Sequence, residues 1–99
     1  MLKNGMRPIH PGEVLREDFL VPLKLSVNAL ATALRVPSTR MHEIANERRG
    51  VSADTALRLA RYFNTSAELW LNLQSAYDLR VAEIEAAQQI KREVLPRAA

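Results

Sequence analysis

The fold is decided by the stretch VNALATALRVPSTRMHEIAN, residues 27–46. Counted from Val27, its fifth residue is the small Ala31, which lets two helices cross closely. Apolar residues at the eighth, tenth, fifteenth and eighteenth places supply the contact between the two helices; they are Leu34, Val36, Met41 and Ile44. This spacing predicts a helix-turn-helix, whose second helix enters the major groove of DNA.

One position departs from the usual pattern of this motif. The ninth place, where glycine is favoured, holds Arg35. A residue with a Cβ is compatible with the turn provided that its backbone is not strongly left-handed.

Helix start and stop signals continue on both sides of the motif. Serine is a favoured N-cap, and a proline inside a helix cannot donate the next backbone hydrogen bond. No segment shows the alternation typical of a β-strand. The sequence therefore predicts an all-α fold of five helices, which lie between Pro11 and Pro22, Ser26 and Pro37, Ser38 and Gly50, Ser52 and Asn64, and Ser66 and about Val94.

Several ends of these helices have specific expected chemistry. Ser38 is expected to cap the third helix, and Gly50 to end it in the left-handed conformation. Thr65 and Glu68 have the spacing of a capping box. We expect three parts in the chain: a flexible N-terminal segment (1–8), the helix-turn-helix domain (9–80), and a C-terminal helix extension with a frayed tail (81–99).

The third helix has more polar side chains than a core helix needs. With Met41 and Ile44 turned inward, its other side chains point outward, and a recognition helix presents such side chains to base edges. The predicted base-reading residues are Ser38, Thr39, His42, Glu43 and Asn46. The predicted phosphate-binding residues are Asn28, Arg40, Arg48 and Arg49.

Ordinary roles remain open for several of these residues. Ser38 acts as a cap whatever the function, and His42 can be a plain surface residue. Glu43 can pair with a nearby arginine, and Arg48 and Arg49 can belong to a solvated loop. Asp54 and Arg58 are spaced as an ion pair along one helix.

Composition narrows the function classes. The formal net charge is +3, with several arginines in the middle third of the chain, which favours nucleic acid as a partner. The chain has no cysteine, its histidines lack metal-ligand spacing, and no glycine-rich phosphate loop is present. We therefore expect no enzyme activity, no cofactor and no metal. No apolar run approaches the ~20 residues of a membrane span, so we expect no membrane contact and a cytoplasmic location.

Two long segments carry a family resemblance. IHPGEVLREDFLVPLKLSVNALATAL and VSADTALRLARYFNTSAELWLNLQSAYDL resemble the HigA antitoxins, a branch of the Xre-type, lambda-repressor-like helix-turn-helix family. The match runs from about Ile9 to Leu79, and DTALRLARYFNTSAELWLNLQ is its most distinctive part. The resemblance implies a five-helix lambda-repressor-like domain whose DNA-reading helix falls on Ser38 to Asn46.

The resemblance also implies a function. Members of this family are antitoxins of type II toxin–antitoxin pairs, which bind and inactivate a HigB toxin, an mRNA-cleaving ribonuclease. They also repress their own operon as homodimers on a palindromic operator. Two-fold symmetry suits such a site, because two recognition helices about 34 Å apart read half-sites one DNA turn apart. The candidate dimer-interface residues lie on the fifth helix and are Trp70, Leu71 and Ile84.

Two other functions remain open at this stage. The chain can be a stand-alone Xre-type transcriptional regulator, or a protein-interaction module that does not bind DNA. Arg35 at the usual glycine place permits the second alternative. RNA binding is disfavoured, because aromatic residues make up only 5% of the chain and none lies within the basic cluster.

Overall fold

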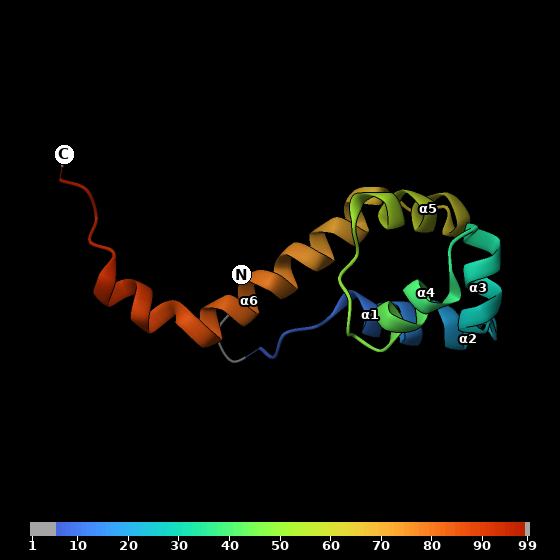
Figure 1. Ribbon diagram of the computed structural model, residues 1–99, viewed down its shortest axis with the longest axis horizontal. Coiled ribbons are helices and arrows are strands. Elements are labelled where there is room, and N and C mark those ends of the chain that lie inside the picture. Colours follow the sequence, from blue (N-terminus) through green and yellow to red (C-terminus); the bar gives the residue numbers. More distant parts are fainter. Residues whose placement is uncertain (1–5, 99) are drawn as a thin grey trace.

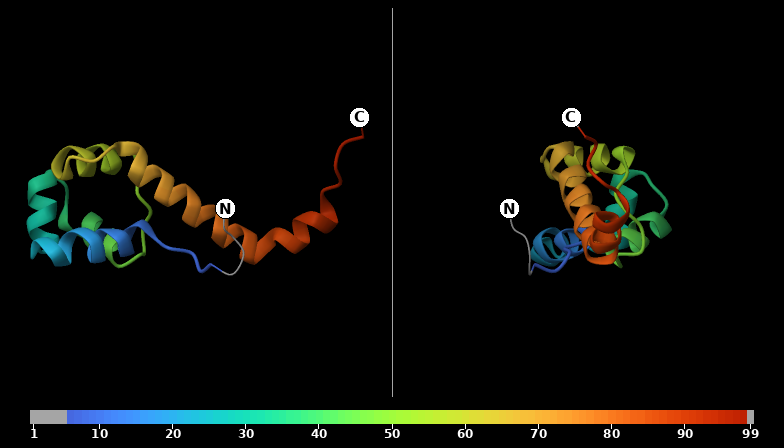
Figure 2. Two further views of the ribbon diagram at one scale, coloured as in Figure 1. Left: turned by 180° about the vertical axis from the view of Figure 1, so that it is seen from behind. Right: turned by 90° about the vertical axis from the view of Figure 1, so that its left-hand side faces the viewer.

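The computed structural model describes residues 6–98, and the regular secondary structure in that range is all helical, as the sequence predicts. Its helical segments are α1 (Pro11–Val14), a π-helical segment (Leu15–Leu20), α2 (Val21–Leu23), α3 (Val27–Leu34), α4 (Ser38–Ala45), α5 (Ala53–Phe63) and α6 (Ala67–Glu93). Because α1, the π-helical segment and α2 are continuous, the described residues form five helices. The second half of α6 projects from the globule, so the molecule measures 53 × 26 × 24 Å (Figures 1 and 2).

The first helix passes through Pro22 instead of ending there. It ends at Lys24, which is left-handed with φ 53°, so the expectation that Pro22 terminates it was wrong. The π-helical winding explains the difference, since the N–H of Val21 bonds to the carbonyl of Arg16, five residues back. The wider turn relieves the clash between a proline ring and the carbonyl four residues before it.

A single apolar core joins the five helices. Ala31, Leu34, Met41 and Ile44 are all buried, which confirms the predicted contact between α3 and α4. The other buried hydrophobic residues of this cluster are Leu15, Leu20, Leu30, Val51, Ala56, Leu59 and Trp70. The helix-turn-helix is therefore part of the main core of the molecule.

Trp70 belongs to this core and not to a surface. Its side chain is 0% exposed, its ring lies 5.1 Å from that of Phe19, and its indole N–H donates to Thr65 Oγ1 at 3.0 Å. The expectation that Trp70 contributes to a dimer interface was therefore wrong. A large amphipathic ring satisfies both needs here, because its apolar body is packed and its N–H is paired.

Two predicted caps also differ from the observed ones. Pro37 occupies the N-cap position of α4 and Ser38 is its first residue, so Ser38 makes no capping hydrogen bond. Ser66, not Thr65, caps α6 by accepting from the N–H of Leu69 at 3.1 Å. Ser26 and Ser52, which stand at the predicted starts of α3 and α5, are the N-caps of these helices.

Non-glycine residues end most of the helices in the left-handed conformation. Asn64 ends α5 as predicted, whereas α4 is followed by left-handed Glu47 and not by a left-handed Gly50. Arg35 is also left-handed, with φ 62°, so the expectation that a residue with a Cβ fits here only when its backbone is not left-handed was wrong. At α4 the N–H groups of Glu47 and Arg48 bond to the carbonyls of Ile44 and Glu43, which are otherwise without helical donors.

The first helix approaches the end of α4 so closely that only glycine fits. A Cβ on Gly12 would lie 1.9 Å from the carbonyl oxygen of Ile44. His10 caps this helix, because its Nδ1 accepts the N–H of Gly12 at 2.9 Å, and its ring packs edge-on against Tyr77 of α6. This corner therefore joins α1, α4 and α6.

The close contact predicts the effect of one added methyl group. Gly12→Ala should lower the free energy of unfolding by about 3 kcal/mol, because backbone must move to admit the Cβ. Urea unfolding followed by circular dichroism measures the change. Gly50→Ala is the matched control, since its Cβ would meet only the flexible side chain of Gln74 at 3.0 Å, and it should cost less than about 1 kcal/mol. Equal losses for both variants would refute the tight-corner explanation.

His10 makes stability depend on pH. Burial lowers its pKa below the ordinary 6.5, opposed by the charges of Glu47 and Asp78. Between the folded pKa and 6.5 the unfolded chain binds more protons than the folded chain. The contribution of His10 is therefore present above pH 6.5 and is lost as pH falls through that window.

Urea unfolding on both sides of pH 6.5 tests this expectation. His10→Asn keeps an N-cap acceptor without a titrating ring, so its stability should depend less steeply on pH than that of the unchanged protein. The same pH slope in both proteins would contradict the assignment.

Candidate nucleic-acid interface

Helix α4 divides its residues cleanly between core and solvent. Met41 and Ile44 are 0% exposed, and Ala45 is buried beside them. Of the five predicted base-reading side chains, Ser38, Thr39, His42 and Asn46 are exposed, and Glu43 is half-buried. Thr39, His42, Glu43 and Asn46 therefore share the solvent-facing side of α4, and Ser38 is exposed at its first turn.

The C-terminal end of α4 is held by the first helix. Arg16, in the π-helical segment, donates through Nη1 to the carbonyl of Ala45 and pairs with Glu47 at 3.1 Å. A cation at this end of a helix also interacts favourably with the helix dipole. The sequence analysis did not identify Arg16, because its partners lie 29 and 31 residues further along the chain.

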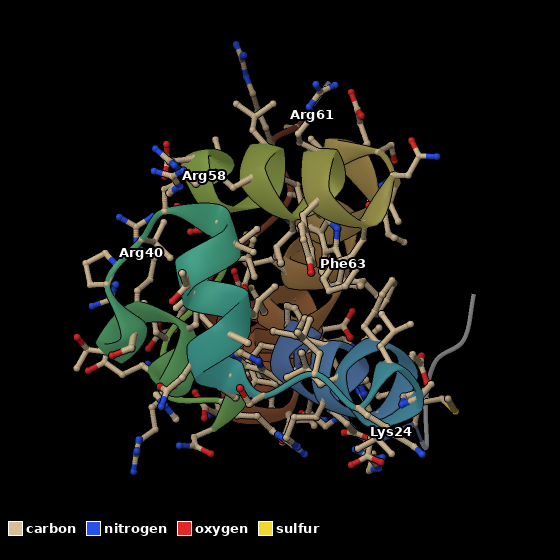
Figure 3. The ribbon with its side chains drawn as sticks, turned by 90° about the vertical axis from the view of Figure 1, so that its right-hand side faces the viewer. Lys24, Arg40, Arg58, Arg61 and Phe63 are labelled. Carbon is tan, nitrogen blue, oxygen red and sulfur yellow. The ribbon has the colours of Figure 1, made fainter. Side chains whose placement is uncertain are left out.

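A charged cluster ties α4 to α5 at its other end. Arg40 and Arg58 both donate to Asp54 Oδ2, at 2.8 and 2.9 Å, and lie together at one side of the molecule (Figure 3). Arg58 Nη1 also donates to the carbonyl of Leu34 at 2.9 Å. The Arg58 guanidinium, followed by that of Arg40, holds the pKa of Asp54 below its ordinary 3.8, so the carboxylate stays charged.

This cluster bears on two expectations. The predicted ion pair between Asp54 and Arg58 is confirmed. Arg40, which we expect to bind a phosphate, is engaged by Asp54, and its side chain is only 28% exposed. Its phosphate role therefore requires that it leave or share this carboxylate.

Asn28 and His42 form a hydrogen-bonded pair across the motif. Nε2 of His42 lies 2.8 Å from Oδ1 of Asn28, and both residues are exposed. When the histidine donates in this bond, the amide NH₂ of Asn28 is left to donate elsewhere. The pair thus links a predicted phosphate contact on α3 to a predicted base contact on α4.

The two remaining arginines differ in their surroundings. Arg49 pairs with Glu43 at 2.8 Å, which is the ordinary role left open for Glu43. Within residues 6–98, Arg48 makes no side-chain hydrogen bond or ion pair and is exposed. Among the predicted phosphate-binding arginines, Arg48 is therefore the one that needs no internal bond to be broken.

The other predicted sites have a simpler description. Leu71 and Ile84 are 36% and 58% exposed, so they remain accessible for a partner. Among residues 6–98 there is no group of three or more potential metal ligands. None of the helices in that range is long and apolar enough to cross a membrane.

The N-terminal and C-terminal segments are partly described. Residues 1–5 of the expected flexible segment lie outside the described range, as does residue 99 of the expected tail. Met6 accepts from Arg80 at 2.6 Å and Arg7 pairs with Glu13 at 2.8 Å, so the described part of this segment is tied to α6 and α1.

Comparison with known proteins extends these observations. No family model matches the chain. Virulence-associated protein I of Dichelobacter nodosus is 59% identical over 81 residues, which is 82% of this chain and 75% of that protein.

Two solved structures share both fold and sequence with the chain. The antitoxin HigA of Pseudomonas aeruginosa, solved with the higBA promoter, is 50% identical in sequence and has a TM-score of 0.90. The match covers 93% of this chain and 100% of that one. The antitoxin GraA in complex with its operator has a TM-score of 0.91 and 52% identity over 100% of both chains. With this identity across the whole helix-turn-helix domain, the chain belongs to the HigA antitoxin family.

Proposed function

We propose that the protein is the antitoxin of a type II toxin–antitoxin pair and represses its own operon by binding operator DNA as a dimer. One observation carries the DNA-binding part: an exposed polar face on α4, held at both ends by the core and by charged ties. The similarity to HigA with its promoter and GraA with its operator supports the same conclusion.

The side chains divide into two roles. Thr39 and Asn46 suit base edges, since threonine can donate, accept or touch a thymine methyl and asparagine can pair with adenine. Arg48 suits a phosphate, which contributes affinity without sequence information. When His42 donates to Asn28 Oδ1, the amide NH₂ of Asn28 remains a free donor, which suits a phosphate contact beside the bases.

The toxin part of the proposal rests on family membership. A HigB-like toxin, an mRNA-cleaving ribonuclease, is neutralised by binding, so the antitoxin needs no catalytic group, metal or cofactor of its own. Because the proposed partners are operator DNA and the toxin, we expect the protein to act in the cytoplasm. We assign no toxin-contacting residues.

Two alternatives make different predictions. A stand-alone Xre-type regulator would bind the operator without any toxin partner, so co-purification with the product of the adjacent gene separates it from an antitoxin. The left-handed Arg35 removes the reason for the second alternative, a module without DNA binding, since the turn of the motif forms in spite of its Cβ.

Fluorescence anisotropy on the DNA upstream of the gene, against scrambled DNA, tests the division of roles. Arg48→Ala should weaken binding to both DNAs and reduce the slope of log affinity against log salt by about one, because one phosphate contact is lost. Lys91→Ala, an exposed cation on the projecting part of α6, is the control and should change neither.

Substitutions on the helix face should act differently. Thr39→Ala or Asn46→Ala should lower the preference for upstream over scrambled DNA by about fivefold or more, with little change in the salt slope. The proposed division between base-reading and phosphate-binding residues is wrong in either of two cases. In the first, Arg48→Ala changes the preference for upstream over scrambled DNA; in the second, Thr39→Ala and Asn46→Ala leave that preference intact.

A further inference from the structure

Helix α5 exposes a stripe that the monomer does not cover. Asp54, Leu57, Arg58 and Arg61 are spaced i, i+3, i+4 and i+7, which places them on one helix face. Leu57, in the middle, is 62% exposed, whereas Thr55, Ala56 and Leu59 on the opposite face are buried. An exposed leucine between charges of opposite sign is an unusual surface for a helix that also supports the core.

The order of these residues makes the stripe complementary to itself. The acid Asp54 lies one turn before the centre and the base Arg61 one turn after it. The midpoint of Asp54 and Arg61 coincides with the midpoint of Leu57 and Arg58. Two α5 helices paired antiparallel at that point therefore place each Asp54 against Arg61 of the second copy, as an isologous contact requires.

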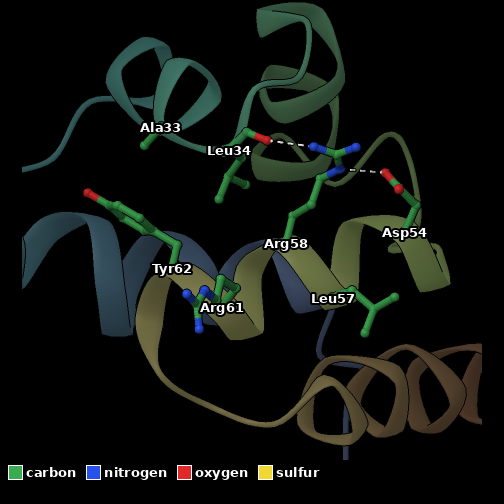
Figure 4. Close-up of a pocket in the computed structure, with 7 residues that line it drawn as sticks. All are labelled: Ala33, Leu34, Asp54, Leu57, Arg58, Arg61 and Tyr62. Carbon is green, nitrogen blue, oxygen red and sulfur yellow. Dashed lines mark hydrogen bonds and ion pairs between the residues drawn. The ribbon is translucent and has the colours of Figure 1, made fainter.

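The charges needed for this pairing are available. Both arginine bonds to Asp54 go to Oδ2, and Oδ1 has no hydrogen-bond partner among residues 6–98. Within that same range Arg61 forms no ion pair. Arg58 is folded back on Leu34, so its guanidinium does not oppose a second copy of itself (Figure 4).

A shallow pocket beside the stripe gives the leucine a place to bind. It is open to solvent and lies between α3 and α5, with Ala33, Leu34 and Tyr62 lining it next to the stripe (Figure 4). The antiparallel pairing places Leu57 of a second copy against Leu57 and Arg58, which also line this pocket. Burying Leu57 would remove from water a side chain that the monomer leaves exposed.

We propose that this α5 stripe is the surface through which two copies of the chain pair. The inference rests on the dimer of the proposed function and names its interface. Asp54 also binds Arg40 of α4, so an interface at α5 is continuous with the element that reads DNA. Pairing through α5 holds the two recognition helices in one dimer, and a palindromic operator needs both helices to bind its two half-sites.

The alternative surface on α6 is less suited to self-pairing. On the face of Ile84, an antiparallel pair centred on that residue would place Arg80 against Gln88 and Val81 against Ala87, with no pair of opposite charges such as α5 offers. Ile84 is exposed to a degree similar to Leu57, at 58% and 62%, which makes it the matched control.

Sedimentation equilibrium on the full chain without DNA tests the proposal. Leu57→Glu should weaken dimer formation by at least about tenfold, and Arg61→Asp should weaken it as well by opposing Asp54 of the second copy. Ile84→Glu should leave the dimer unchanged. Circular dichroism confirms folding, which these exposed positions should preserve.

Cross-linking provides a second test that does not depend on weakening the dimer. Because the chain has no cysteine, Leu57→Cys introduces a single thiol, and mild oxidation should join two chains rapidly at low concentration. Ile84→Cys should show little cross-linking under the same conditions. A monomeric parent protein, or cross-linking through Ile84→Cys and not Leu57→Cys, would overturn the proposal.

Operator binding distinguishes failure of this inference from failure of the proposed function. If the protein dimerises through another surface and binds the upstream DNA, only the α5 interface is wrong. If it pairs through α5 and shows no preference for the upstream DNA, the interface stands and operator repression is wrong.

Discussion

The contact between Gly12 and the carbonyl of Ile44 sets the position of the helix that faces DNA. Because a Cβ would lie 1.9 Å from that oxygen, the backbones of the first helix and α4 touch at this point. Arg16 strengthens the corner by binding the carbonyl of Ala45, which has lost its helical donor. The orientation of α4 therefore follows from backbone contacts, which leave little room for adjustment.

Ion pairs and hydrogen bonds between side chains complete this arrangement. They also determine which arginines near α4 remain free to bind a ligand. Asp54 holds Arg40 and Arg58, Glu43 holds Arg49, and Asn28 holds His42. Exposed ion pairs of this kind contribute little to stability. Their larger effect is on binding, since DNA phosphates must compete with carboxylates for the same guanidinium groups.

Much of the fold could be predicted from residues 27–46 and the serines that precede the helices. Apolar spacing over one or two turns identified Leu34, Met41 and Ile44 as core, because such residues face the same side of a helix. Contacts between distant segments could not be predicted in this way. The closeness of Gly12 to Ile44 and the ties of Arg16 and Asp54 depend on how helices pack, which local spacing does not encode.

The errors have similar physical reasons. Trp70 continues an apolar stripe in the sequence, but its indole is buried because Thr65 accepts its N–H and Phe19 packs on it. Arg35 occupies the left-handed turn because the N–H of Val36 bonds back to the carbonyl of Ala31 and the buried interface on both sides offsets the local strain. The outward polar face of α4 was predicted correctly, since it follows from the inward positions of Met41 and Ile44.

The most direct test of the account is an NMR titration of ¹⁵N-labelled protein with the DNA upstream of its gene. The backbone amides of residues 38–46, with those of Asn28 and Arg48, should shift most as DNA is added. Amides in the projecting half of α6 should stay where they are. Shifts confined to α6, with residues 38–46 unperturbed at saturating DNA, would contradict the claim that α4 reads the operator.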